Sequence, residues 1–344
     1  MRTPDDAYAL IDGGVMIDIK DADAHLQSLC LRALGKSRPN PNVAAAIFSA
    51  QGQLIADGFH DRTVSVDHAE VVAIENAKRE LTGTSIAITL EPCSHHGKTP
   101  PCADALIAAG IKNVFYAVSD PNEIASGGGA KLKAAGINVT AGVLQEEAAF
   151  ANRAWLASIA NKRPYFIWKI ATTLDGRTSA TDGSSKWISN ELSRQYVAEL
   201  RNQSDAILVG TGTVINDVPN LVSENQALRI AVGNRAIPSG AKIADSRAPF
   251  YHHQSRDFST LITELQKRNI VSVLVEAGST LGSELLKAGL IDEIAIFTAP
   301  KILGAGTSFV TDLGITNIAS AKELKLIESK QFEGDLFNRY QVVR

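Results

Sequence analysis

The chain reads Glu91-Pro92-Cys93-Ser94-His95-His96-Gly97-Lys98-Thr99-Pro100-Pro101-Cys102 after an upstream His68-Ala69-Glu70, and these two segments indicate how it folds and what it binds. One histidine and two cysteines supply three ligands, the number that leaves a catalytic zinc one open position for water. A structural zinc site would need a fourth ligand. The pattern therefore predicts a catalytic Zn²⁺ held by His68, Cys93 and Cys102.

Glu70 assigns this metal site to a class of chemistry. Zinc deaminases of nucleobases carry H-x-E followed by P-C-x-x-C, and their glutamate is the general acid/base. Glu70 stands at that position, so we predict that it is the catalytic residue. Eight residues separate Cys93 from Cys102 instead of two, and this basic, glycine-containing insert could bind an anion.

Composition limits the other possibilities. A chain of 344 residues with 45% hydrophobic and 21% charged residues is ordinary for a soluble protein and long enough for two domains. The net charge of −3 argues against bulk nucleic-acid binding, and no apolar run could span a membrane. The first twenty residues do not resemble a signal peptide. Three cysteines, of which Cys30 fits a helix core better than a metal site, suit a cytoplasmic protein.

Strands and helices alternate along the chain. In the first half we expect a helix over 26–34, strands at 43–48, 54–56 and 85–90, and a helix from His68 to about Glu80 capped by Asp67. Pro100-Pro101 should open the next helix, whereas 126–129 is predicted to be a loop. Helix ends of the form Ala-Gly followed by a strand recur at 109–110, 135–136 and 288–289. This alternation predicts α/β sandwiches with mainly parallel sheets.

We divide the chain into an N-terminal tail (1–20), a zinc deaminase domain (21–150), a linker (151–164) and a second domain (165–344). In the second domain, 173–177 is predicted to be a tight turn, and 205–210 a strand that ends in a Gly-Thr-rich loop. A strand at 271–275 leads through Glu276-Ala277-Gly278 into a helix whose N-terminus suits a pyrophosphate. The fingerprint G-x-G-x-x-G is absent, which argues against a Rossmann domain.

Taken together, these motifs resemble the bifunctional pyrimidine deaminase/reductase of riboflavin biosynthesis. The resemblance covers roughly residues 20–344 and rests on 39–43, 91–102, 174–177, 185–188, 212–214, 276–281 and 300–304. It implies a cytidine-deaminase-like α/β/α sandwich followed by a dihydrofolate-reductase-like α/β domain that uses NADPH. The implied substrate is 2,5-diamino-6-ribosylamino-4(3H)-pyrimidinone 5′-phosphate, which is deaminated before its ribosyl group is reduced to ribityl.

The resemblance also implies roles for individual residues. The deaminase substrate would contact Asn40, His95 and Lys98. The reductase substrate would contact Ser185, Arg201, Leu221 and Glu276. The NADPH contacts would be Ala171, Trp187, Thr213, Asp217, Gly278, Ser279, Thr280, Leu281, Gly282, Ser283 and Glu284. Considered without the family, Arg201 could equally form a surface pair with Glu199, and His252-His253 is expected to be solvated.

The second half departs from the family at one loop. Where the family has Asp-Asp-Pro-x-Leu-Thr-Val-Arg, this chain has Asp217-Val218-Pro219-Asn220-Leu221-Val222-Ser223-Glu224. The family's arginine contacts substrate, and a glutamate there would repel a phosphate. Either Arg229 or another cation replaces that arginine, or the reductase is weak.

Two alternative functions stay open at this point. The first is a deaminase of a nucleoside or tRNA base, against which the acidic balance and the basic insert argue. The second is a deaminase whose second half is a non-catalytic dimerisation or ligand-binding module. In the main interpretation as well we expect a homo-oligomer, a dimer or tetramer. Release of ammonia from cytidine would favour the first, and NADPH binding without turnover the second.

Overall fold

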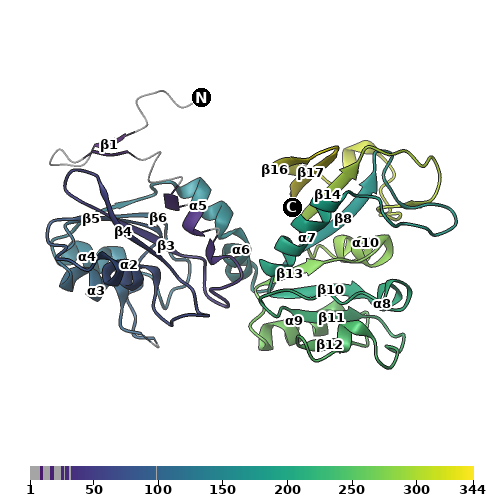
Figure 1. The fold of residues 1–344 in the computed structure, drawn as a ribbon, viewed down its shortest axis with the longest axis horizontal. Coiled ribbons are helices and arrows are strands. Elements are labelled where there is room, and N and C mark those ends of the chain that lie inside the picture. Colours follow the sequence, from purple (N-terminus) through teal and green to yellow (C-terminus); the bar gives the residue numbers. More distant parts are fainter. Residues whose placement is uncertain (1–7, 11–15, 19–24, 27, 31, 98) are drawn as a thin grey trace. The chain divides into compact units, whose positions relative to one another are not determined.

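The computed structural model describes residues 8–10, 16–18, 25–26, 28–30, 32–97 and 99–344 (Figure 1). Their contacts divide the chain into two compact units, residues 1–162 and 163–344. The finer division into tail, domains and linker stays a prediction, and the segment 151–164 contains a helix, α6 (Arg153–Asn161). No helix in the described ranges is long and apolar enough to cross a membrane.

The first unit is an α/β/α sandwich around a five-stranded sheet of order β4-β3-β5-β6-β7. One face of this sheet packs on α2, α3 and α4, and the other on Leu26, Leu29, Cys30 and Ala33 and on α5. The elements are β1 (Tyr8–Leu10), β2 (Met16–Asp18), β3 (Ala44–Phe48), β4 (Leu54–Phe59), α2 (Ala69–Ala77), β5 (Ser85–Leu90), α3 (Cys102–Ala108), β6 (Asn113–Val118), α4 (Gly128–Ala134), β7 (Asn138–Ala141) and α5 (Gln145–Ala151).

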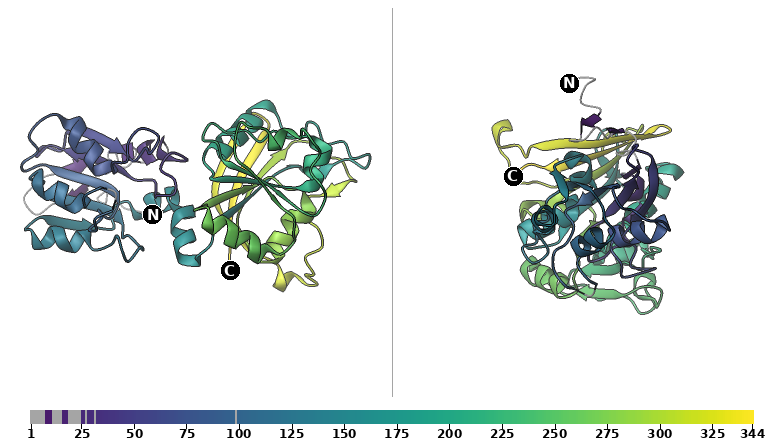
Figure 2. Two further views of the ribbon diagram at one scale, coloured as in Figure 1. Left: turned by 90° about the horizontal axis from the view of Figure 1, so that it is seen from below. Right: turned by 90° about the vertical axis from the view of Figure 1, so that its left-hand side faces the viewer.

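The second unit is built on an eight-stranded sheet of order β12-β11-β10-β13-β8-β14-β17-β16, with helices on both faces (Figure 2). Helices α9 and α10 cover one face, and α8 the other. The elements are β8 (Tyr165–Thr173), β9 (Arg177–Ser179), α7 (Glu191–Asn202), β10 (Ala206–Gly210), α8 (Thr211–Asp217), β11 (Leu228–Val232), β12 (Phe250–His253), α9 (Phe258–Lys267), β13 (Ser272–Val275), α10 (Ser279–Lys287), β14 (Ile291–Ala299), β15 (Thr307–Ser308), β16 (Leu324–Phe332) and β17 (Asp335–Val342).

The expected α/β class is confirmed, with a correction to the strand directions. The second sheet is parallel from β12 to β14 and antiparallel only where β17 joins β14 and β16. In the first sheet only the pairs β5–β6 and β6–β7 are parallel. Strand β3 runs antiparallel to both of its neighbours, β4 and β5, and the turn at Gln51-Gly52 folds β4 back on it as a hairpin. The first sheet is therefore mixed.

Three local predictions were wrong. Helix α2 begins at Ala69 and not at His68, because Asp67 accepts a hydrogen bond from the Ser65 hydroxyl at 2.5 Å instead of capping the helix. Gly128 and Gly129 belong to α4 and not to a loop. The Gly-Thr segment after β10 is the first turn of α8. At Asp67 a competing local hydrogen bond overrode the cap preference, whereas at the glycine run the distant Glu91 carboxylate accepts from the Gly127 and Gly129 N–H groups at the start of α4.

A close backbone contact sets the position of α2 against the first sheet. A Cβ atom at Gly58 of β4 would lie 2.6 Å from both the Ala69 oxygen and the Ala73 nitrogen of α2. Only glycine allows this approach. The first turn of α2, which carries Glu70, is therefore held directly on the sheet.

Candidate active sites

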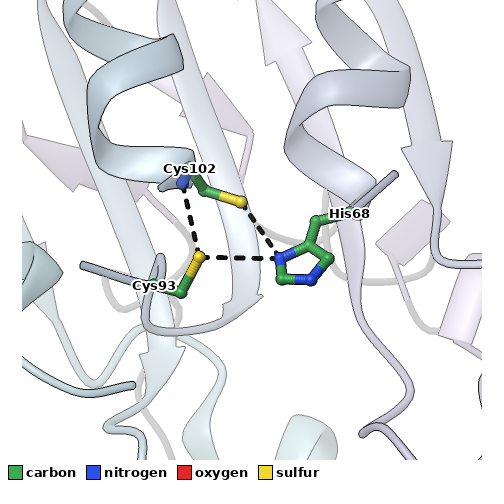
Figure 3. Close-up of side chains that lie close together, drawn as sticks. All are labelled: His68, Cys93 and Cys102. Atoms are coloured by element: carbon green, nitrogen blue, oxygen red, sulfur yellow. Dashed lines mark hydrogen bonds between the residues drawn. The ribbon is translucent and has the colours of Figure 1, made fainter. Parts of the chain in front are cut away.

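The three predicted zinc ligands come together at the start of two helices (Figure 3). His68 precedes α2, Cys93 follows β5, and Cys102 is the first residue of α3. The Nδ1 atom of His68 lies 3.2 Å from the Cys102 sulfur and 3.6 Å from the Cys93 sulfur. All three ligand atoms fall within 4.8 Å of one another. This set of one imidazole and two thiols fits a zinc ion with one position left for water.

The electrostatics separate the two site cysteines from Cys30. Cys93 accepts hydrogen bonds from the Cys102 thiol, from His68 and from the Cys102 backbone N–H, and these lower its pKa well below the ordinary value of a thiol, against the effect of burial. The same pairing raises the pKa of Cys102, so the two sulfurs share a proton that a metal would displace. Burial raises the pKa of Cys30 to about 11. Cys30 is only 1% exposed and packs with Leu26 and Leu29, which confirms it as a core residue.

Glu70 has the environment of a general base. It lies in the first turn of α2 and is 3% exposed, and burial raises its pKa. Within the described part of the chain, its buried Oε2 atom has no hydrogen-bond partner. An unpaired carboxylate oxygen beside a three-ligand metal site is ready to accept a proton from a water molecule.

A cavity of about 370 Å³ opens over these groups. The cavity residues include the predicted substrate contacts Asn40 and His95, whereas Lys98 lies outside the described residues. The lining residues are Pro39, Asn40, Pro41, Val43, His60, Arg62, Val66, His68, Glu70, Leu90, Glu91, Cys93, His95, Gly97, Thr99, Asp120, Asn122, Ala125 and Trp155. Its volume suits a small organic molecule.

His60 is a cavity residue that the sequence did not indicate. Its Nδ1 atom lies 2.7 Å from the carbonyl oxygen of Asp67, so Nδ1 carries the proton and Nε2 is an acceptor. Nε2 lies 2.9 Å from the Asn40 amide nitrogen, which must therefore be the donor. Burial lowers the pKa of His60 and keeps the ring neutral. These bonds leave the side-chain carbonyl oxygen of Asn40 to accept a hydrogen bond from a ligand. No spacing in the sequence indicates that Asn40 and His60 are in contact.

Glu91 fixes the wall of the cavity next to Cys93. Its Oε1 atom accepts from the N–H groups of Gly127 and Gly129 at 3.2 and 3.0 Å, and Oε2 accepts from the Asp120 N–H at 3.2 Å. A Cβ atom at Gly128 would lie 1.8 Å from the Pro92 oxygen. The glycine run is therefore needed for α4 to begin against the metal loop.

The second unit has a larger cavity, of about 510 Å³, beside the carboxyl ends of β10, β11 and β13. Ligands of parallel α/β sheets bind at this edge. Six predicted NADPH contacts line it: Thr213, Gly278, Ser279, Thr280, Leu281 and Glu284. The other lining residues are Gly210, Thr211, Gly212, Val232, Gly233, Asn234, Arg235 and Arg256. Backbone N–H groups of glycine-rich turns suit the phosphates of a dinucleotide.

The remaining predicted cofactor contacts lie elsewhere. Gly282 packs so closely on Trp168 that a Cβ atom would lie 2.1 Å from its ring, and the buried Ser283 hydroxyl accepts from the Thr311 N–H. Trp187 is 64% exposed and stacks with Arg194. Asp217 ends α8 and Ala171 belongs to β8. The cofactor roles of these residues stay predictions.

Two of the predicted reductase substrate contacts form an ion pair. The Arg201 guanidinium donates to Glu276 at 2.5 and 2.9 Å, and the Lys169 ammonium lies 3.0 Å from the same carboxylate. Burial alone would raise the pKa of Glu276, but Lys169 and Arg201 outweigh it and hold this pKa at about 2. Arg201 is thus not a surface partner of Glu199. Lys169 was missed, although a lysine within an apolar strand was a visible signal.

Arg229 does not take the place of the family's arginine in the loop 217–224. This arginine is fully buried, and it donates to Asp245 at 2.9 Å and to the carbonyl oxygens of Asn220 and Lys242. It therefore supports the fold, and the suggestion that it replaces the family's arginine is wrong. Glu224 is exposed.

The remaining predicted residues of this unit differ in how far they are buried. Leu221 is buried at 3% exposure, and Ser185 is exposed. His253 was expected to be solvated but is a 4% exposed residue of β12, where packing of the strand against α9 buries it.

Comparisons with known proteins give one family match for each of the two units of the chain. Residues 20–118 match the family model of the cytidine and deoxycytidylate deaminase zinc-binding region, and residues 164–337 match that of the RibD C-terminal domain. The riboflavin biosynthesis protein RibD of Mycobacterium tuberculosis is 41% identical over 83% of this chain and 86% of its own length. RibD of Escherichia coli is 34% identical, over 91% and 96%.

Solved structures give the same result. The diaminohydroxyphosphoribosylaminopyrimidine deaminase/5-amino-6-(5-phosphoribosylamino)uracil reductase of Thermotoga maritima superposes with a TM-score of 0.86, at 32% identity, over 94% of this chain and 99% of its own. RibD of Acinetobacter baumannii gives a TM-score of 0.84 at 34% identity, over 95% and 99%. With its zinc deaminase unit and its NADPH-dependent reductase unit, the chain therefore belongs to the RibD family of bifunctional riboflavin biosynthesis enzymes.

Proposed function

We propose that the cavity beside Glu70 carries out the deamination, with His68, Cys93 and Cys102 as the zinc ligands. Bound there, zinc would supply a water molecule whose pKa is lowered toward about 7. The observation that carries the proposal is the unpaired Oε2 atom of Glu70 beside the three ligand atoms. Glu70 takes the water proton and delivers it to the pyrimidine ring nitrogen and the leaving ammonia.

The other cavity residues would hold the substrate. The Asn40 carbonyl oxygen, fixed by His60, accepts from an N–H group of the pyrimidine. His95 lines the same cavity, and among the described residues its buried Nδ1 atom has no partner. We assign His95, together with Lys98, to the ribose 5′-phosphate of the substrate, because a phosphate needs donors and positive charge.

In the second unit we propose that Lys169, Arg201 and Glu276 face the ribosyl group. Reduction to the ribityl chain adds one hydride and one proton; bound NADPH supplies the hydride. The proton needs an acid, and we assign this role to the Lys169 ammonium, which lies 3.0 Å from Glu276 and two residues along β8 from the predicted cofactor contact Ala171. The Glu276 carboxylate orients both cations.

Replacing Glu70 by glutamine tests the deaminase assignment. Glutamine keeps the shape and the volume but cannot carry the proton, so ammonia release from the diamino substrate should fall by about 10²–10⁴-fold. Zinc content, measured by atomic absorption, should stay at the wild-type level. Retained deamination with bound zinc would remove Glu70 from the mechanism.

We further propose that the enzyme is a cytoplasmic homo-oligomer without a nucleic-acid partner. Strand β16 is the edge of the eight-stranded sheet and exposes Leu324 and Leu326, and Leu336 on β17 is also exposed. An edge strand of nine residues with two exposed leucines at its start offers unpaired backbone groups and apolar surface to a second copy. Light scattering on the full chain should give a dimer or tetramer mass that Leu326→Lys reduces; a monomeric wild type would contradict the proposal.

A further inference from the structure

One end of the second cavity carries two arginines that no other part of the function has used. Arg235 follows β11 and Arg256 follows β12, and both side chains line the cavity. The sheet order β12-β11-β10-β13-β8 places these strands on the side away from β8. The cavity is thus positively charged at the end opposite to Lys169 and Glu276.

The direction in which a dinucleotide lies follows from this order. Its hydride-donating ring must approach the ribosyl group near Lys169 of β8 and Glu276, which directly follows β13. The turns after β10 and β13 then face the pyrophosphate. Neighbouring strands are about 4.8 Å apart, so β11 lies about 14 Å from β8 across three strand spacings. The adenosine half of the cofactor therefore falls toward the arginines.

Arg235 is the arginine whose charge is available. Within the part of the chain that the structure describes, no carboxylate pairs with Arg235, and its side chain is exposed. Its Nη1 atom lies 3.8 Å from where a Cβ atom of Gly212 would be, so the guanidinium lies over the first turn of α8. Arg256, in contrast, already donates to Glu284 at 2.7 Å.

The turn that delivers Arg235 has a constrained shape. Gly233 has a φ of +130°, and a Cβ atom there would lie 2.6 Å from the Thr211 hydroxyl. A residue with a side chain would be strained and would collide with α8. The backbone therefore brings β11 close to α8 and directs the next residues across the cavity mouth.

We propose that Arg235 binds the 2′-phosphate of the adenosine ribose and so makes the reductase select NADPH over NADH. The inference rests on the NADPH-dependent reductase function given above. A guanidinium donates two parallel hydrogen bonds to a phosphate, and an unpaired one gives up no existing ion pair to do so. Arg256 serves as a second, partly neutralised cation at the same end.

The test measures binding of two fragments to the full-length protein by calorimetry. Adenosine 2′,5′-bisphosphate carries the 2′-phosphate, and 5′-AMP lacks it. Wild-type protein should prefer the bisphosphate, and Arg235→Gln should reduce the ratio of the two affinities by about ten- to a hundredfold, the range expected for charge-assisted hydrogen bonds. Arg235→Lys should fall between the two. The ratio of kcat/KM for NADPH to that for NADH should follow the same order.

Arg268→Gln is the matched control, because Arg268 forms an exposed pair with Glu264 on α9 and does not line the cavity. It should leave the affinity ratio unchanged. An unchanged ratio in Arg235→Gln, or a larger loss in Arg256→Gln, would overturn the proposal while NADPH oxidation by the wild type continued. A wild type that oxidises no NADPH and binds neither fragment would overturn the reductase function as well.

Discussion

The two active sites of this enzyme are built in different ways. The zinc site takes its ligands and its base from two short segments, 68–70 and 91–102, each anchored by a helix start or by the end of a buried strand. The reductase site takes Lys169 from β8, Arg201 from α7 and Glu276 from the turn after β13. The residues of a contiguous site can be recognised from their spacing in the sequence. A distributed site depends on the order of the strands, and its residues hold one another in place by charge.

The largest effect is expected from removing a zinc ligand. Cys102→Ala leaves two ligands, so zinc should be lost and ammonia release should fall below detection, because no metal remains to activate water. NADPH oxidation with the deaminated substrate should continue. Zinc content and both activities are measured on one preparation.

Cys30→Ala is the matched control for this variant. Both cysteines are buried, at 1% and 0% exposure, and only Cys102 contacts His68. The control should keep its zinc. Loss of zinc from both variants to the same extent would mean that core packing, and not ligation, explains the result.

A smaller effect, confined to the second unit, is expected from Glu276→Gln. The change leaves Arg201 and Lys169 without their buried counter-charge, which should cost up to about 3–5 kcal/mol of stability. It should also lower kcat/KM for NADPH oxidation without changing ammonia release. Urea unfolding and the two activity assays check this; a loss of deaminase activity would contradict the independence of the two sites.

Glu264→Gln is the matched control for the stability loss expected of Glu276→Gln. Glu264 forms an exposed pair with Arg268, so its replacement should cost only about 0.3–0.5 kcal/mol.

The folded pKa of Glu276, about 2, lies below the ordinary value. Its contribution to stability is therefore complete above about pH 4.5 and is lost as the pH falls toward 2, a loss that Glu276→Gln should not show.

A smaller effect than that of Glu276→Gln concerns the loop that departs from the family. Val218 caps the C-terminus of α8 with a φ of +46°, in the left-handed region that β-branched residues avoid and asparagine tolerates. Since Val218 is 47% exposed, Val218→Asn should remove strain without losing core packing and stabilise the second unit by about 1 kcal/mol. Thermal unfolding measures this. A lower melting temperature would show that the valine side chain packs usefully.

The zinc site could be predicted from the sequence more fully than the reductase site, because its residues lie in two short segments whereas those of the reductase site are spread over the sheet. Spacing alone brought His68, Glu70, Cys93 and Cys102 together, because helix starts and strand ends fix local geometry. His60 and Glu91 act through the Asp67 carbonyl and the amides of α4, contacts that have no spacing signal. In the second unit, the family resemblance named Arg201 and Glu276 separately, but only the sheet order shows that they meet. The burial of Arg229 was equally invisible, since a basic residue in a strand has no local sign of its partners.

The most direct test of two independent sites uses the Glu70→Gln protein with two substrates. Supplied with the deaminated ribosylamino-uracil phosphate and NADPH, it should oxidise NADPH at the wild-type rate and form the ribityl product. Supplied with the diamino substrate, it should release ammonia about 10²–10⁴-fold more slowly than the wild type. No NADPH oxidation by either the variant or the wild type would contradict the account and leave a deaminase joined to an inactive reductase-like unit.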